Sequence, residues 1–100
     1  MEEEVQALLE GAAAFLAKAC QALEAARAHG RNVDQAAAAV EQLAAAHAKL
    51  DRSVATLGLR VFAYQAHNLT HLQKQIDETM TCSEAADSVL AALRHATNQA

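Results

Sequence analysis

Large apolar residues recur every three or four positions along the first part of the chain, which is the spacing of one face of an α-helix. Leu9, Leu16 and Leu23 form a row with a strict spacing of seven residues. Such a row is typical of a helix that is buried along one side against another helix. The pattern predicts a first helix over about residues 3–28.

The stretch "AHGRNVDQ", residues 28–35, predicts a tight turn after this helix. Gly30 suits the left-handed residue that follows a helix end. Asn32, with Gln35 three residues later, is the pattern of an N-cap with a capping box. A connection this short makes the next helix antiparallel to the first. We therefore expect an antiparallel helical hairpin.

A second apolar row begins near residue 33 and changes direction partway along. At about 100° per residue, its centre rotates across residues 57–65. Gly58 either breaks the helix there or lies inside one long helix that changes partner. Glycine in a helix interior costs only about 1 kcal/mol, so we favour one continuous helix over about residues 33–80.

The stretch "TMTCSEAAD", residues 79–87, predicts a second boundary. Thr81 with Glu84 forms a capping box, or Ser83 caps the next helix directly. A last helix then follows over about residues 84–97.

These elements make residues 1–100 a single all-α domain. The expected architecture is an antiparallel hairpin with a shorter C-terminal helix folded back on it. This is a three-helix bundle, or a four-helix bundle if the chain breaks at Gly58.

The composition favours helix formation but supplies few large side chains to fill a core. Hydrophobic residues make up 53% of the 100 residues, but 27 of the residues are alanine and only 3% are aromatic. Alanine favours helices and buries little area. Proline is absent from the sequence and no stretch alternates in the manner of a strand. A small domain with so few large core side chains favours a partner chain or self-association.

Charge and cysteine usage narrow the class further. The net charge is −4 and the eight Lys and Arg are scattered, so a nucleic-acid partner is not expected. No apolar run reaches the roughly 18–20 residues of a membrane span, so no membrane insertion is expected. The opening "MEEEV" is opposite in sign to a secretory signal. Cys20 and Cys82 form no C-x-x-C motif, which favours a reduced, cytoplasmic location.

The stretch "AHNLTHLQKQ", residues 66–75, carries the strongest candidate for chemistry. His67 and His71 are four residues apart, so both side chains can reach one metal ion. A zinc site needs a third protein ligand, and Lys74 lies before the next acidic residue on that side, Glu78. We interpret the pair as an exposed surface pair and expect no metal or cofactor.

The start of that stretch, "AHNL", resembles the phospho-accepting motif of histidine phosphotransfer domains, which are all-helical and of similar size. The resemblance implies that His67 accepts a phosphoryl group. That family places a lysine three positions after the histidine and a small residue next, where this sequence has Thr70 and His71.

His47 lies in the apolar row between Val40 and Val54, which is the position of a polar interface group that sets register or oligomeric state. The stretch that follows it, "AKLDRSVATL", residues 48–57, is similar to small helical subunits of lysosome-positioning and organelle-biogenesis scaffold complexes. That resemblance implies side-by-side assembly with other helical chains.

The sequence therefore predicts a non-enzymatic helical interaction module, with a helical protein partner or further copies of itself. The alternative is a small ligand-binding, metal-binding or phosphotransfer-like bundle that uses His67 and His71. No catalytic or cofactor-binding residue is predicted. The residues expected in the core or interface are Leu9, Leu16, Leu23, Val40, Leu43, His47, Leu50, Val54, Leu57, Phe62, Leu69, Leu72 and Ile76.

Overall fold

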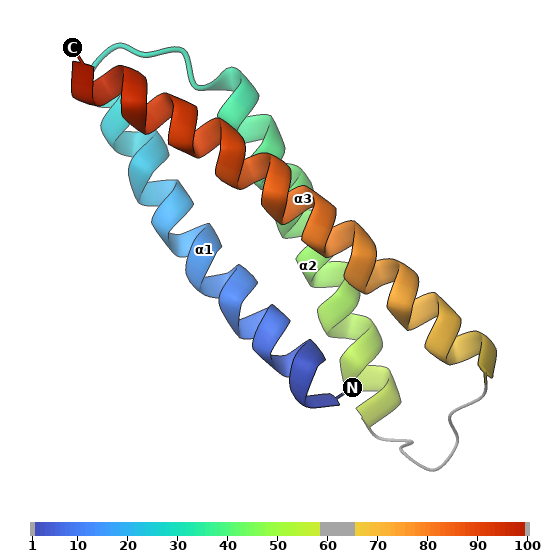
Figure 1. Cartoon of the computed structure of the whole chain (residues 1–100). Coiled ribbons are helices and arrows are strands. Elements are labelled where there is room, and N and C mark those ends of the chain that lie inside the picture. Colours follow the sequence, from blue (N-terminus) through green and yellow to red (C-terminus); the bar gives the residue numbers. More distant parts are fainter. Residues whose placement is uncertain (1, 59–65, 100) are drawn as a thin grey trace.

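The computed structural model describes residues 2–58 and 66–99, and the side chains of residues 3–56 and 70–97 (Figure 1). This described part contains three α-helices and no strand. The helices are α1 (Glu2–Ala28, 27 residues), α2 (Asp34–Gly58, 25 residues) and α3 (Ala66–Gln99, 34 residues).

The three helices form an elongated bundle with extents of 55 × 17 × 17 Å. Helices α1 and α3 run in the same direction and α2 runs in the opposite direction (Figure 1). The most extensive helix–helix interface joins α2 to α3, and α1 lies against both. The prediction of an all-α bundle with an antiparallel hairpin is confirmed.

The turn between α1 and α2 has the geometry that its sequence predicts. Gly30 has a φ of 74°, which is the left-handed region that glycine adopts without strain. Its amide donates to the Arg27 carbonyl at 2.9 Å and the Arg31 amide donates to the Ala26 carbonyl at 3.0 Å, which together make a Schellman motif. Asn32 Oδ1 accepts from the Asp34 amide at 3.0 Å, so Asn32 is the N-cap of α2.

The predicted continuous helix over residues 33–80 is wrong. Helix α2 ends at Gly58, and α3 runs back along it. The Thr79 hydroxyl lies 3.4 Å from the Ala46 carbonyl of α2, a contact that a single straight helix through both residues excludes. The physical reason is that the apolar rows on either side of the glycine pack against each other. Residues 59–65, where the rotation of the row was centred, lie outside the described residues.

The predicted boundary near Thr81 is also wrong, because α3 continues through it and the expected last helix, 84–97, is its second half. The Thr81 hydroxyl donates to the Asp77 carbonyl at 2.9 Å, so it bonds back into its own helix and does not cap a new one. Thr97 makes the same bond to Leu93 at 2.9 Å.

Most of the core residues form two apolar clusters, one toward each end of the bundle. The first cluster lies near the turn between α1 and α2, and Leu23, Val40 and Leu90 join the three helices there. The second cluster lies toward the other end, where Leu9, Leu50 and Leu72 meet. Each cluster takes residues from all three helices, so burial of the apolar rows holds the bundle together.

Charged side chains lie on the outer faces of all three helices, as Glu24, Asp51 and Asp77 illustrate. Across the described ranges, no helix is both long enough and apolar enough to cross a membrane.

Candidate functional site

Two buried polar residues of α3, Thr79 and Gln75, interrupt the apolar core of the bundle. Thr79 is fully buried, and its hydroxyl donates to the Gln75 carbonyl at 2.9 Å and lies 3.4 Å from the Ala46 carbonyl. The side chain therefore bonds into its own helix and reaches the backbone of α2.

Gln75 is 5% exposed and only partly satisfied. Its Nε2 lies 3.1 Å from Nε2 of His71, so the amide donates to an unprotonated imidazole nitrogen. Its Oε1 is buried without a hydrogen-bond partner in the described structure. A buried acceptor of this kind destabilises the folded chain by about 1–3 kcal/mol.

His47 connects α2 to α1. Its Nε2 lies 3.1 Å from the Leu9 carbonyl, to which it donates, and the side chain is half-buried. The imidazole is therefore a partnered polar group at the edge of the α1–α2 interface. Its proposed effect on register or oligomeric state stays a prediction.

Of the predicted histidine pair, only the side chain of His71 belongs to the described part of the structure. His71 is exposed and bonded to Gln75, whereas the side chain of His67 lies outside the described residues. Within the described part of the chain, no three His, Cys, Asp or Glu side chains gather in a group that can hold a metal ion. Glu78 is half-buried and Lys74 is exposed.

The two cysteines are free thiols in different helices. Cys20 is exposed on α1, and Cys82 is half-buried in the middle of α3. Cys82 therefore lies inside a helix and not in a turn.

Most of the residues predicted for the core or interface lie inside the bundle. Leu9, Leu23, Val40, Leu43, Leu50 and Leu72 are buried. Leu16, His47, Val54 and Ile76 are half-buried. Leu57, Phe62 and Leu69 lie outside the described side chains.

The clearest departure from a solvated surface lies on α1. Residues 11–17, "GAAAFLA", contain no polar side chain over about two helical turns. Only Ala12 in this segment is buried, while Phe15 and Leu16 are half-buried and the other four residues are exposed. A helix that is apolar all round is normally buried on all sides. This segment is the candidate interface.

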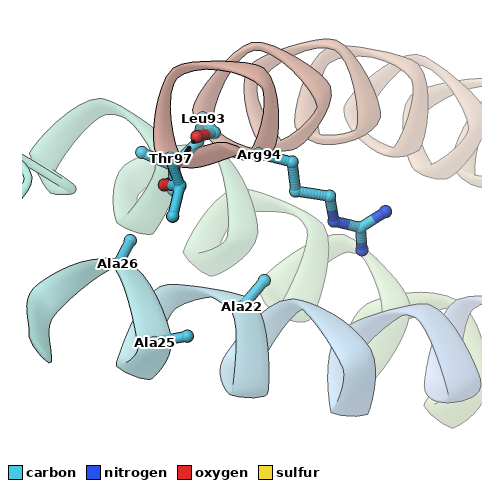
Figure 2. A pocket seen from close by; sticks show the side chains of 6 residues that line it. All are labelled: Ala22, Ala25, Ala26, Leu93, Arg94 and Thr97. Atoms are coloured by element: carbon cyan, nitrogen blue, oxygen red, sulfur yellow. Dashed lines mark hydrogen bonds between the residues drawn. The ribbon is translucent and has the colours of Figure 1, made fainter. Parts of the chain in front are cut away.

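Two shallow grooves lie on the described surface of the bundle, near the turn between α1 and α2. One, of about 240 Å³, lies between α1 and α3 (Figure 2). Three alanines form its α1 wall, and its lining is Ala22, Ala25, Ala26, Leu93, Arg94 and Thr97. The Thr97 hydroxyl is already bonded to its own helix and Arg94 is exposed at the edge. The second groove, of about 370 Å³, lies between α2 and α3 around Ala36 and Val89. Neither lining contains a buried, unbonded polar group.

Apolar spacing did not identify three residues with special contacts: Gln75, Thr79 and Arg31. The Arg31 Nη2 donates to the Ala96 carbonyl at 3.1 Å, so the turn before α2 is bonded to the last turn of α3. The burial of Thr79 could have been inferred from its spacing. It lies seven residues from both Leu72 and Ala86, which are buried on the same side of α3.

Comparison with protein-family models, curated protein sequences and solved structures gives no match for this chain.

Proposed function

We propose that the chain is a non-enzymatic helical interaction module, which self-associates or forms one subunit of a helical assembly. The observation that carries the proposal is the apolar segment at residues 11–17 of α1. Its exposed members are glycine and alanine, which allow another helix to approach closely.

The remaining surface supports a limited interface on α1. Among the described residues, Met80 is the one large hydrophobic side chain that is exposed, at 48%. The other large apolar side chains within residues 3–56 and 70–97 are buried or half-buried. Association through α1 therefore leaves the rest of the fold intact.

The test is the molar mass of the protein in solution, measured by size-exclusion chromatography with light scattering over a wide concentration range. We expect a mass above that of one chain. Ala14→Glu places a charge in the apolar segment and should reduce the mass to that of one chain. A single-chain mass for the natural sequence at every concentration contradicts self-association and leaves only assembly with a different helical chain.

Ala91→Glu is the matched control, because Ala91 is also exposed in a helix. Its neighbours three and four positions away are Asp87, Ser88, Arg94 and His95, which are all polar. The same substitution there should leave the mass unchanged. If both substitutions reduce the molar mass equally, the added negative charge controls association and the apolar segment of α1 does not.

A further inference from the structure

Gly11 lies at the centre of an apolar patch on the outer side of α1. On a helix, the neighbours of a residue are three and four positions away. For Gly11 these are Ala7, Leu8, Ala14 and Phe15, of which the alanines are exposed and the two larger residues are half-buried.

The packing of the chain itself does not require glycine at this position. A Cβ atom built on Gly11 meets no atom within 4 Å, and the residue does not have a positive φ. Glycine in a helix interior is destabilising relative to alanine. A residue that weakens α1 without relieving any contact in the bundle indicates a close approach from outside.

Two opposite charges flank this patch at equal distances. Glu4 lies seven residues before Gly11 and Lys18 lies seven residues after it, and both are exposed. Seven residues correspond to two helical turns within about 20°, so the three residues share one row. In α1, neither charge has an opposite charge three or four positions away.

We propose that a second copy of this chain docks antiparallel on this face of α1, with a two-fold axis at Gly11. This inference rests on the proposed function and specifies its partner. The axis places Glu4 level with Lys18 of the second copy, and Lys18 level with Glu4 of that copy. Each ion pair occurs twice in the dimer, as two-fold symmetry requires.

The apolar neighbours are complementary under the same symmetry. Leu8 lies opposite Ala14 of the second copy, and Phe15 lies opposite Ala7 of that copy. Each large side chain therefore meets a small one, which allows the two surfaces to interlock. The two glycines meet at the axis, where the backbones come closest.

The parallel arrangement lacks this complementarity. It places Glu4 opposite Glu4 and Lys18 opposite Lys18, so both charge pairs become repulsive. It also places Leu8 opposite Leu8. The charges on this face therefore select the antiparallel orientation and disfavour the parallel one.

Charge reversal tests the pairing by sedimentation equilibrium. Glu4→Lys and Lys18→Glu should each weaken the dimer about tenfold, because both symmetric ion pairs become like-charge pairs. The double variant Glu4→Lys with Lys18→Glu should restore the natural dissociation constant. An equimolar mixture of the two single variants should form heterodimers, since every charge then has an opposite partner.

Glu24→Lys on α1 and Lys49→Glu on α2 are matched controls, because both residues are exposed and lie outside the patch. They should leave the dissociation constant unchanged. Gly11→Leu should weaken the dimer by about tenfold or more through overpacking at the axis. Circular dichroism should show unchanged helix content, since the space beside Gly11 is open within the chain.

The outcomes separate this inference from the proposed function. If the chain associates but the charge reversals and Gly11→Leu have no effect, the docking on α1 is wrong and the proposed function stands. If the natural chain sediments as a single molecule at every concentration, both this inference and the self-association in the proposed function are wrong. Recovery of the dimer only in the double variant and in the mixture supports the antiparallel pairing.

Discussion

Helices α1 and α3 depart from an ordinary amphipathic pattern in opposite directions. On α3, the polar residues Gln75 and Thr79 are buried in the bundle. On α1, the apolar residues of the segment 11–17 remain exposed or half-buried, apart from Ala12. One helix has polar groups inside, and the other has apolar groups outside.

The two helices differ in whether their unusual side chains have contact partners within the same chain. Thr79 bonds to a carbonyl of its own helix and lies within reach of α2, so the fold of one chain accommodates it. The apolar outer face of α1 has no counterpart among the described residues of the chain. Under the proposed function, the buried face of α3 is adapted to the bundle and the apolar outer face of α1 is adapted to an assembly.

The largest expected effect is on the free energy of unfolding, at core positions where all three helices meet. Leu50→Ala should lower the free energy of unfolding by about 3 kcal/mol, because Leu50 is fully buried in the cluster with Leu9 and Leu72. Leu16→Ala, on half-buried α1 surface, should lower it by only about 1 kcal/mol in the single chain. Urea denaturation at low protein concentration measures both. Equal losses would contradict the view that α1 is the less enclosed helix.

Replacing the buried Gln75 of α3 with an apolar residue should stabilise the fold. Gln75→Leu should raise the free energy of unfolding by about 1.5 kcal/mol, because it removes a buried acceptor without a partner. Gln73→Leu, at an exposed position of the same helix, should change it by less than about 0.5 kcal/mol. Thermal unfolding of the two variants measures the difference. A loss of stability in Gln75→Leu would show that its bond to His71 outweighs the unpaired oxygen.

Two glycines should respond to the same substitution with opposite signs. Gly11→Ala should raise the free energy of unfolding of the single chain by about 1 kcal/mol, since the added Cβ meets open space. Gly30→Ala should lower it by about 1 kcal/mol, because its φ of 74° is unfavourable for alanine. Denaturation curves measure both, and a destabilising Gly11→Ala would contradict the absence of an intramolecular role for this glycine.

The smallest expected effect is at His47. Replacement by leucine should raise the free energy of unfolding by about 0.5 kcal/mol, because the Leu9 carbonyl keeps its helical partner and apolar burial increases. The distribution of oligomer masses should become broader, since a polar group that restricts register is lost. Light scattering tests this second effect. An unchanged distribution counts against a role of His47 in partner choice.

Local signals explain which parts of the fold were predictable from sequence. Gly30 and Asn32 act through hydrogen bonds to residues within four or five positions, so the turn between α1 and α2 follows from the sequence nearby. Thr81 was misinterpreted because a threonine that caps a helix and one that bonds back inside a helix look alike in sequence. The distinction depends on the packing of α3 along α2.

The reversal after α2 and the buried polar residues required information about tertiary structure. The rotation of the apolar row near Gly58 fits either a change of partner or a change of direction. Contacts between α2 and α3, such as those of Thr79 with Ala46 and of Leu72 with the cluster around Leu50, decide between them. A search for apolar periodicity does not identify Gln75 as buried, because its side chain is polar. The candidate interface on α1 was partly visible, since Leu16 belongs to the predicted row, but the importance of Gly11 depends on the open space around it.

The bond from Arg31 to the Ala96 carbonyl has a consequence for the order of folding. It joins residues 65 positions apart, so it forms only after the last turn of α3 has docked beside the turn that precedes α2. Exchange of the neighbouring turn amides with solvent deuterium therefore reports on the docking of a helix that is distant in sequence. The turn serves as a local reporter of the completed bundle.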